Sequence, residues 1–367
     1  MVGSGKTVMV AMSGGVDSAV AASVLAEAGH EVVGVTLKLW GGDSDSGCCS
    51  VSDVDDARRV ARQIGIEHHV FNLGQDFERF VIDPYVADHQ AGRTPNPCIE
   101  CNRHIKFDKL LRRADALGFD YVATGHHAQI VRQSGLGQGQ GDEVLRIGRG
   151  ADPAKDQSYV LYMLDQSQLE RLLLPVGALT KDEVRQRAVE LGLRVAAKPD
   201  SQDVCFIHSD GGRRAFLGDR IPLAPARLVD LDGNTVGRVA SVELMTIGQR
   251  RGLDLGGDAE RRYVIDIDPP AGVVTVGHRS DLMVESQSLE ELAFSFECSS
   301  AGGSPIQGVE TRTFQCSAHG QARSGRLRGT IINWDSPQPI VARGQSIVIY
   351  DGDLVLGGGI AGPVWAR

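Results

Sequence analysis

The sequence lacks any apolar run near the length of about 18–20 residues that a bilayer-spanning helix needs. Residues 1–7 form a short polar segment without the apolar core of a signal peptide. These two absences predict a cytoplasmic protein without a membrane partner. Lysine is also scarce, because only 7 of the 38 basic residues are lysine, and the formal net charge is −9. That balance argues against a polybasic protein that coats nucleic acid, but arginine can still make local contacts with phosphate.

A disulfide framework is a further absence. The seven cysteines are an odd number in a long chain without a secretory signal, so we expect reduced thiols. With 42% hydrophobic and 23% charged residues, the composition excludes disordered, collagen-like and coiled-coil proteins. At about 150 residues per domain, a chain of 367 residues predicts two to three domains.

The first 130 residues alternate short apolar segments with segments of helical periodicity. Strands are predicted at 7–12, 31–39, 68–71 and 121–124, and helices at 17–27, 54–64, 77–90 and 107–117. This alternation predicts an α/β fold with a doubly wound parallel sheet, in which ligands bind at the carboxyl ends of strands. Helical patterns resume at 166–173 and 181–191.

The rest of the sequence is β-rich. A glycine-rich polar loop is predicted at 134–142, and glycine and prolines at 217–227 mark a boundary. Strand-like segments follow at 236–247, 263–267, 273–276, 330–333, 346–350 and 354–356, with another loop at 299–307. We expect domains at 1–213, 214–282 and 283–367, of which the second is a small β-rich domain and the third a β-barrel or sandwich.

The segment Ser13–Ser18 (SGGVDS) lies between the first predicted strand and the first predicted helix. Its two glycines permit a tight turn and a close approach of backbone N–H groups to an anion, and the helix dipole favours phosphate there. Ser13 and Ser18 add hydroxyl donors. Asp17 would repel a bare phosphate, which is explained if Mg²⁺ lies between it and a polyphosphate. The alternative is an ordinary strand–helix turn.

Three cysteines stand out from the others. Cys98 and Cys101 form a C-x-x-C with basic residues close behind, which raises the thiolate fraction. Cys205 lies in the segment DSQDVCF. A zinc ribbon needs a second C-x-x-C, which the sequence lacks, so these cysteines suit sulfur transfer or an iron–sulfur cluster with one open iron. We expect no chemical role for the remaining cysteines, Cys48, Cys49, Cys298 and Cys316.

Seven segments carry a resemblance to a known family. In order they are AMSGGVDS (11–18), GRTPNPCIECNRHIKF (92–107), ATGHH (123–127), KDQSYVLY (155–162), DSQDVCFI (200–207), GQRRGL (248–253) and GQSIVIYDGDLVLGGGI (344–360). SGGVDS resembles the PP-loop of ATP pyrophosphatases, and the whole set resembles the tRNA-specific 2-thiouridylases of the MnmA/TrmU type over nearly the whole chain. The resemblance implies a Rossmann-like PP-loop ATP-binding domain, a small central domain and a C-terminal β-barrel.

The activity that the resemblance implies is the ATP-dependent 2-thiolation of the wobble uridine of Glu, Gln and Lys tRNAs. The uridine 2-oxygen is adenylated, sulfur comes from a cysteine persulfide, and AMP is released. The implied cofactors are ATP and Mg²⁺. The implied partners are tRNA and a persulfide sulfur donor, either a cysteine desulfurase or a sulfur-relay protein, and the chain is expected to be a monomer.

The resemblance also implies a role for individual residues. Cys205 matches the cysteine that bears the persulfide, Cys101 matches the second catalytic cysteine, and Asp17 takes part through Mg²⁺. The positions implied for ATP are Ala11, Met12, Ser13, Gly14, Gly15, Val16, Asp17, Ser18, Leu37 and Gly125. Those implied for the target base are Asn96, Pro97 and Cys98, and those for tRNA are His126, Lys155, Asp156, Gln157 and Gln345.

Two departures from the family pattern leave alternatives open. Many members have Asp, with an acid–base or orienting role, where this sequence has Cys98. Either that proton chemistry is carried differently or Cys98 serves another purpose, such as ligating a [4Fe–4S] cluster with Cys101 and Cys205. Residues 316–328 also lack an expected Arg-Tyr pair, although Arg323, Arg326 and Arg328 lie there as phosphate contacts or as a solvated charged strand. Another PP-loop ATP-dependent synthetase, and a thiol redox or RNA-binding protein, are the alternatives from other classes.

Overall fold

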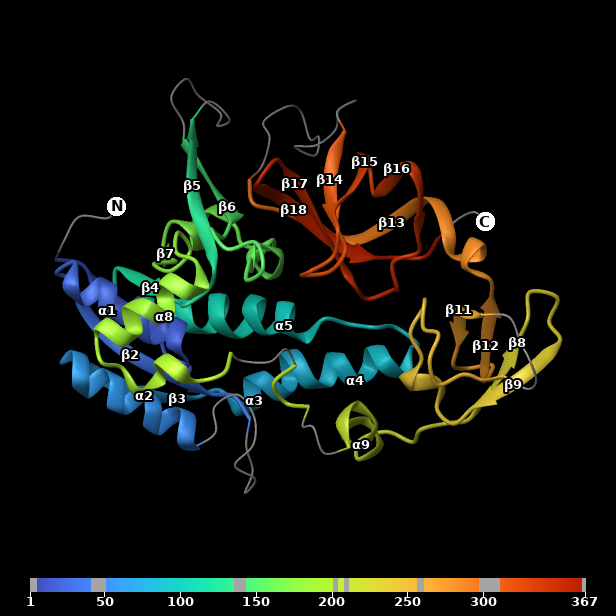
Figure 1. Ribbon diagram of the computed structural model, residues 1–367, viewed down its shortest axis with the longest axis horizontal. Coiled ribbons are helices and arrows are strands. Elements are labelled where there is room, and N and C mark those ends of the chain that lie inside the picture. The colour runs from blue at the N-terminus through green and yellow to red at the C-terminus, as the bar shows by residue number, and fades with distance from the viewer. Residues whose placement is uncertain are drawn as a thin grey trace.

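The computed structural model describes residues 5–40, 51–134, 143–200, 204–207, 211–255, 261–296 and 311–364. The strands form three β-sheets, an N-terminal, a middle and a C-terminal one, and long helical segments run between them in space (Figure 1). Within the described residues, no helix has both the length and the apolar character needed to cross a membrane.

The N-terminal sheet confirms the predicted doubly wound parallel fold. Its strands are β1 (Thr7–Ala11), β2 (Glu31–Lys38), β3 (Glu67–Asn72), β4 (Tyr121–Ala123) and β7 (Leu172–Leu173). They lie in the order β3-β2-β1-β4-β7, and every neighbouring pair is parallel. The chain leaves β1 toward β2 and β3 and then returns to β4 on the other side of β1. The carboxyl ends of β1 and β4 therefore form a topological switch point, where such sheets bind ligands.

Helices cover this sheet and extend away from it. Beside the sheet lie α1 (Val16–Glu27), α2 (Val51–Ile64) and α8 (Lys181–Glu190). Two long helical segments cross the middle of the molecule (Figure 1). The first joins α3 (Gly74–Phe77), the π-helical η1 (Glu78–Ile82) and α4 (Asp83–Gln90), and the second joins α5 (Pro97–Glu100), the π-helical η2 (Cys101–Lys109) and α6 (Leu110–Ala116).

The middle sheet contains β8 (Ala226–Val229), β9 (Thr235–Val239), β10 (Asp254–Leu255), β11 (Tyr263–Asp268) and β12 (Val273–Gly277), in the order β10-β9-β8-β12-β11. The strand predicted at 236–247 ends at Val239, because the chain turns into the short 3₁₀-helix η5 (Val242–Leu244). There the buried Glu243 side chain accepts a hydrogen bond from the Ala224 N–H, and its carbonyl lies 3.1 Å from His89 Nδ1. Burial lowers the pKa of His89 to about 4.

The C-terminal strands form a closed barrel, the first of the two predicted alternatives. The barrel consists of β13 (Met283–Phe294), β14 (Arg312–Gln315), β15 (Arg323–Arg328), β16 (Ile331–Pro339), β17 (Ser346–Asp351) and β18 (Leu354–Ala361). Pairing of β13 with both β16 and β18 closes it. A hairpin of β5 (Ala128–Ser134) and β6 (Glu143–Arg149) extends the sheet, since Gly148 pairs with Leu354. The hairpin therefore links the N-terminal part of the chain to the barrel.

Several details differ from the sequence expectations. The helix predicted at 166–173 is wrong in its second half, where Leu172 and Leu173 pair with β4 as the edge strand β7. Its first half forms α7 (Gln166–Leu169), capped by Asp165. The remaining short elements are η3 (Ser158–Leu161), η4 (Arg194–Ala197), α9 (Gly212–Gly218) and η6 (Arg279–Leu282). The loop at 299–307, most of the loop at 134–142, and Cys48, Cys49 and Cys298 lie outside the described residues.

Candidate functional site

The site begins with two backbone segments that lie against each other at the switch point. A Cβ added to Gly125, just after β4, would lie 2.6 Å from the Ser18 backbone nitrogen. Gly14 has a φ of +73°, and a Cβ there would lie 2.3 Å from the Asp53 carbonyl oxygen. These distances are shorter than real Cβ contacts, so only glycine fits at either position without moving the backbone.

The loop from Ser13 to Ser18 is stabilised by hydrogen bonds between its own residues and by contacts from Lys198. The Ser18 hydroxyl accepts a hydrogen bond from the Ser13 N–H at 3.2 Å and donates to the Gly15 carbonyl at 3.3 Å. From outside, Lys198 Nζ donates to the Gly14 carbonyl at 3.0 Å and forms 2.7 Å ion pairs with Asp53 and Asp56. Burial alone would lower the pKa of Lys198, but these carboxylates raise it. The lysine therefore stays charged while it braces the loop.

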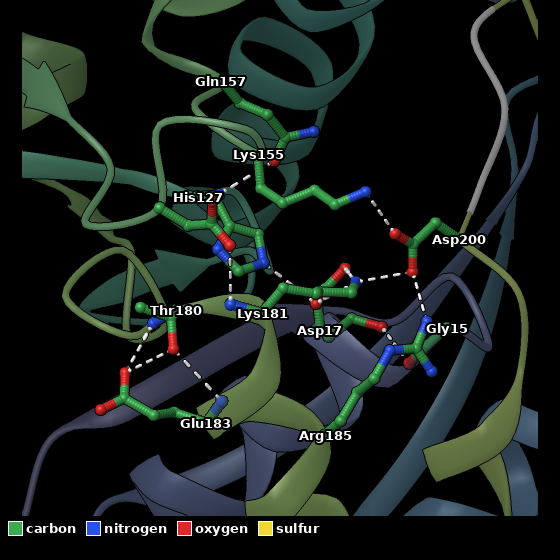
Figure 2. A network of polar contacts seen from close by, with 12 residues as sticks. Gly15, Asp17, His127, Lys155, Gln157, Thr180, Lys181, Glu183, Arg185 and Asp200 are labelled. Carbon is green, nitrogen blue, oxygen red and sulfur yellow. Dashed lines mark hydrogen bonds and ion pairs between the residues drawn. The ribbon is translucent and has the colours of Figure 1, made fainter.

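Asp17, in the first turn of α1, is ion-paired within the site (Figure 2). Both of its carboxylate oxygens lie 2.8 Å from Lys181 Nζ, and Oδ1 lies 3.1 Å from His127 Nε2. Burial alone would raise the pKa of Asp17, but hydrogen bonds from His127 and Lys181 lower it. The carboxylate is therefore ionised at neutral pH, as a magnesium ligand must be.

A second carboxylate, that of Asp200, lies near Asp17 and forms ion pairs with three cationic side chains (Figure 2). Lys155 Nζ lies 2.8 Å from Oδ2, and Lys181 Nζ and an Arg185 guanidinium nitrogen lie 2.9 Å and 2.7 Å from Oδ1. Burial alone would raise the pKa of Asp200, but hydrogen bonds from Lys155 and Lys181 hold it far below its usual range. The site thus combines three side-chain cations with two carboxylates, which favours binding of a polyphosphate.

The tRNA positions implied by the resemblance lie in different surroundings. Lys155 is half-buried and belongs to the cation group, and Gln157 is exposed, with its Oε1 accepting from the His127 N–H at 2.9 Å. Asp156 is buried and accepts hydrogen bonds from Arg149, the Gly150 N–H, and the Ser158 N–H and hydroxyl. Those contacts give Asp156 a part in the internal structure, and its contact with tRNA stays a prediction.

Asp156 also takes part in a connection to the barrel. The Ser158 hydroxyl lies 3.0 Å from the Tyr350 hydroxyl of β17, and the Arg149 guanidinium lies 4.0 Å from the centre of the Tyr350 ring. Arg149 also donates to Gln315 of β14 at 2.9 Å. The segment that carries Lys155 and Gln157 is therefore anchored to the barrel, while these two residues contact Asp200 and His127 of the site.

His126 and Gln345, two further implied tRNA positions, also have internal contacts. His126 is buried 2.7 Å from the Thr124 hydroxyl, and burial lowers its pKa well below the usual value, so its imidazole is neutral. Gln345 Nε2 donates to the Thr94 carbonyl at 2.5 Å. Since Thr94 also donates its N–H to the Arg343 carbonyl, the barrel holds the segment that leads into Asn96.

Cys98 and Cys101 lie on the helical segment formed by α5 and η2. Asn96 caps the start of this segment, because its side chain accepts a hydrogen bond from the Cys98 N–H at 3.1 Å. Pro97 is buried, Cys98 is half-buried on α5, and Cys101 is buried at the start of η2. Cys205 is half-buried in the turn Val204–Ile207. Next to it, the buried Phe206 ring lies 5.3 Å from that of Tyr85 on α4, which anchors the turn to the first long helical segment.

Among the described residues, no disulfide bond involves Cys98, Cys101, Cys205 or Cys316. Within the same residues, no group of three or more histidine, cysteine, aspartate or glutamate side chains is arranged to hold a metal ion. The three cysteines singled out by the sequence therefore do not form a three-ligand cluster site in this structure. Burial raises the pKa of Cys316 to about 11.

The other implied residues are placed as follows. Ala11 ends β1, and Met12 and Val16 are buried. Leu37 is buried near the carboxyl end of β2. In the barrel, Arg323 donates to the Pro339 carbonyl and Arg326 pairs with Asp335 at 3.1 Å, while Arg328 is exposed.

Several residues of the site carry no motif of their own in the sequence. Lys181, Arg185 and Lys198 lie outside the segments that carry the family resemblance, and Asp200 only begins the segment DSQDVCFI. One sequence feature points to them: lysine is scarce, yet three of the seven lysines are Lys155, Lys181 and Lys198. Lys181 and Lys198 contact the loop, and Lys155 pairs with Asp200 beside it.

Comparisons with known proteins agree with the segment pattern. Residues 6–209 match the family model "tRNA methyl transferase HUP domain", residues 214–278 match "tRNA methyl transferase PRC-barrel domain", and residues 309–361 match "Aminomethyltransferase beta-barrel domain". A tRNA-specific 2-thiouridylase MnmA of Roseiflexus sp. (strain RS-1) is 45% identical, over 96% of this chain and 98% of the relative. The protein of the same name from Thermobifida fusca is 44% identical, over 95% of this chain and 94% of the relative.

Similarity to solved structures is much weaker. A 4-thiouridine synthetase in complex with RNA and ATP has a TM-score of 0.34 and 18% identity, over 54% of this chain and 44% of that chain. The NMN synthetase of Francisella tularensis has a TM-score of 0.32 and 19% identity, over 54% of this chain and 67% of that chain. Similarity at this level supports no conclusion about this chain.

Proposed function

Because this chain belongs to the tRNA-specific 2-thiouridylase family, we propose that it converts the wobble uridine of Glu, Gln and Lys tRNAs to 2-thiouridine with ATP. The observation that carries the proposal is the ion-paired loop at the switch point, in the same domain as Cys101 and Cys205. A phosphate loop alone serves many ATP-dependent reactions, and the separated cysteines supply a reason for sulfur chemistry.

ATP binds at the loop Ser13–Ser18 in this proposal, with Leu37 and Gly125 beside the adenosine. Backbone N–H groups at the start of α1 and the ammonium groups of Lys155 and Lys181 face the phosphates. Asp17 would hold the Mg²⁺ that accompanies the nucleotide, and the ion would supply positive charge to the phosphates. Lys181 contacts both oxygens of Asp17, and a phosphate oxygen that binds this lysine would replace part of that contact.

The first chemical step is adenylation. The uridine 2-oxygen attacks the α-phosphate of ATP, and pyrophosphate leaves. The 2-oxygen, a poor leaving group by itself, can then leave as part of AMP. The N–H donors and cations stabilise the negative charge that develops on the phosphates. The wobble base must leave its stack to reach the site, as base-modifying enzymes require, and the segment Asn96–Cys98 contacts it.

Sulfur transfer follows from the two cysteines. The terminal sulfur of a persulfide on Cys205 attacks the activated carbon, and AMP leaves with the oxygen. The Cys101 thiolate then attacks the Cys205 Sγ and breaks the sulfur–sulfur bond, which leaves 2-thiouridine and a Cys101–Cys205 disulfide. A dithiol reductant and a persulfide donor, from a cysteine desulfurase or a relay protein, return both cysteines to the starting state.

The remaining expectations stay proposals. The chain acts as a cytoplasmic monomer, tRNA contacts His126, Lys155, Asp156, Gln157 and Gln345, and the domain boundaries lie near 213 and 283. Either the proton chemistry of the Asp that many family members have at this position is carried differently, or Cys98 serves another purpose. A [4Fe–4S] cluster on Cys98, Cys101 and Cys205 is the alternative, and iron and sulfide quantitation after anaerobic purification distinguishes the two. Activity of the iron-free protein would support the persulfide scheme. If activity requires a stoichiometric cluster, the cluster mechanism replaces the persulfide scheme.

The test compares Cys205→Ser with Cys316→Ser, a matched change at a half-buried thiol that follows β14 of the barrel. With ATP, a persulfide donor and tRNA, Cys205→Ser is expected to lose thiolation by roughly 10³-fold or more, as for loss of a nucleophile. It still forms adenylated tRNA, because the loop is intact. Cys316→Ser thiolates like the wild type. If Cys205→Ser keeps thiolating, Cys205 does not carry the sulfur.

A further inference from the structure

One segment that carries the family resemblance, GQRRGL (248–253), has no part in the reaction proposed for the loop and the cysteines. It forms the turn between η5 and β10 of the middle sheet. Arg250 and Arg251 lie at its centre and are exposed, and neither guanidinium has an ion pair or a hydrogen bond among the described residues. No acidic residue lies between Thr246 and Leu253, although the whole chain has a net charge of −9. The turn therefore presents two adjacent positive charges to solvent.

The side chain of Gln249 fixes the shape of this turn. Its Oε1 accepts a hydrogen bond from the Thr246 N–H at 3.1 Å, and its Nε2 donates to the Arg251 carbonyl at 2.9 Å. The Gly248 N–H donates to the Val264 carbonyl of β11 at 2.8 Å, and the Val264 N–H donates back to the Gln249 carbonyl at 2.9 Å. Because the backbone of the turn is already ordered, a partner that binds the two arginines loses less free energy to ordering them.

The turn is connected to the segment that leads to the implied target-base residues. The Thr94 hydroxyl donates to the Thr246 hydroxyl at 3.3 Å, and Thr94 lies two residues before Asn96. The backbone of Thr94 is held by the barrel, through hydrogen bonds with the Arg343 carbonyl and with Gln345 Nε2. Thr94 is therefore a point at which the helical segment of the cysteines, the middle sheet and the barrel meet.

Two further contacts hold the middle sheet against this part of the chain. His89 Nδ1, at the end of α4, lies 3.1 Å from the Glu243 carbonyl. A Cβ added to Gly92 would lie 2.9 Å from Pro269 Cγ, so the backbone at Gly92 packs directly against the residue that follows β11. Four residues of chain, at most about 14 Å, separate Thr246 from Arg250. The arginines thus lie close to the place where the proposed function puts the target base.

We propose that Arg250 and Arg251 bind backbone phosphates of the tRNA whose wobble uridine lies against Asn96–Cys98. The proposal rests on the proposed function, because that function makes tRNA the substrate and places the base at this segment. A guanidinium binds phosphate through two parallel hydrogen bonds, and an RNA strand carries one phosphate per nucleotide. Contacts of this kind orient the nucleic acid without reading its sequence, which leaves selection of the uridine to the residues that touch the base.

The experiment compares three double variants on the full chain: Arg250→Gln/Arg251→Gln, Arg250→Lys/Arg251→Lys and Arg59→Gln/Arg62→Gln. Arg59 and Arg62 are exposed on α2, at the other end of the molecule from the middle sheet (Figure 1), so this control removes the same charge elsewhere. The Kd for a Glu tRNA transcript is measured by fluorescence anisotropy over a range of salt concentrations. The Kd for Mg·ATP, measured by calorimetry, reports whether the fold of each variant is intact.

Each phosphate contact contributes about 0.7–0.9 to the slope of log Kd against log salt concentration. Loss of both contacts in Arg250→Gln/Arg251→Gln is expected to reduce this slope by about 1.4–1.8. Extrapolated from 1 M salt, where counterion release no longer favours binding, the Kd for tRNA rises roughly 20- to 60-fold at about 0.1 M salt. The lysine variant keeps most of the slope because it keeps both charges. The α2 variant binds tRNA like the wild type, and all three bind Mg·ATP like the wild type.

Two results overturn the proposal. One is an unchanged tRNA Kd and salt slope in Arg250→Gln/Arg251→Gln; if this variant then loses thiolation only with a protein sulfur donor, the arginines bind an acidic face of that donor. The other is an equal loss of tRNA affinity in the α2 variant, which would show an effect of net charge alone. Failure of the proposed function looks different, since the wild type would then bind tRNA through the two arginines and form no 2-thiouridine.

Discussion

Replacing Lys181 with methionine tests the assignment of the polyphosphate site most specifically. The change removes one of three cations that face two carboxylates and keeps the length of the side chain. It leaves no carboxylate without a partner, because Asp17 keeps His127 and Asp200 keeps Lys155 and Arg185. The destabilisation is therefore about 1–2 kcal/mol, not the 3–5 kcal/mol of an unpaired buried charge, and the variant is expected to fold.

The effect on ATP is larger. A hydrogen bond between charged groups contributes about 1.5–3 kcal/mol, which corresponds to a Kd for Mg·ATP raised roughly 10- to 100-fold. Calorimetry with Mg·ATP measures this directly. The matched control is Arg187→Met on the same helix, because Arg187 pairs with Glu27 and Glu190 and not with the loop. The reasoning is refuted if Lys181→Met binds ATP within about threefold of the wild type.

Three further predictions concern the loop, the acid response and the altered cysteine. Gly125→Ala is expected to weaken ATP binding at least tenfold, because the new Cβ would lie 2.6 Å from the backbone of the loop. Gly218→Ala is the control, since its nearest contact is 3.5 Å away, and it is expected to bind ATP like the wild type. Equal ATP affinities of the two variants in calorimetry would contradict this. The depressed pKa of Asp200 means that its contribution to stability is present above the unfolded value of about 3.9 and is lost as pH falls through the lower folded value. The difference in melting temperature between wild type and Asp200→Asn should accordingly shrink below about pH 4, and a constant difference would show that these ion pairs do not stabilise the fold. Cys98→Asp is expected to retain thiolation in iron-free protein, because the persulfide scheme needs sulfur only at Cys101 and Cys205; loss of thiolation in a nucleoside assay, together with loss of bound iron, would favour the cluster.

Local patterns in the sequence predicted those parts of the fold that local forces determine. The loop Ser13–Ser18 was predicted because an apolar strand, two glycines and a helix follow one another within a few residues. The strand β7 was not predicted, because the leucines at 172–174 also fit a helix and only pairing with β4 makes them a strand. The hairpin of β5 and β6 was not predicted for a similar reason, since it extends the barrel through the pairing of Gly148 with Leu354, more than 200 positions later.

Some residues of the candidate site could be recognised from the sequence, and others become apparent only in the folded chain. The sequence alone indicated Asp17 and the cysteines, because their neighbours carry recognisable chemistry. Lys181 lies 164 positions from Asp17, and no local pattern links a lysine at the start of a helix to a carboxylate at the start of another. Ion pairs between distant segments form only when the sheet brings the ends of its strands and helices together.

The central claim is that the chain thiolates tRNA through an adenylated uridine. The most direct measurement incubates the iron-free wild type with tRNA, a persulfide donor and ATP labelled at the α-phosphate, and then quantifies 2-thiouridine in the digested tRNA together with labelled AMP. The account predicts one AMP for each 2-thiouridine, and no AMP when tRNA is left out. Formation of 2-thiouridine without AMP, or of AMP without any thiolated nucleoside, would contradict it.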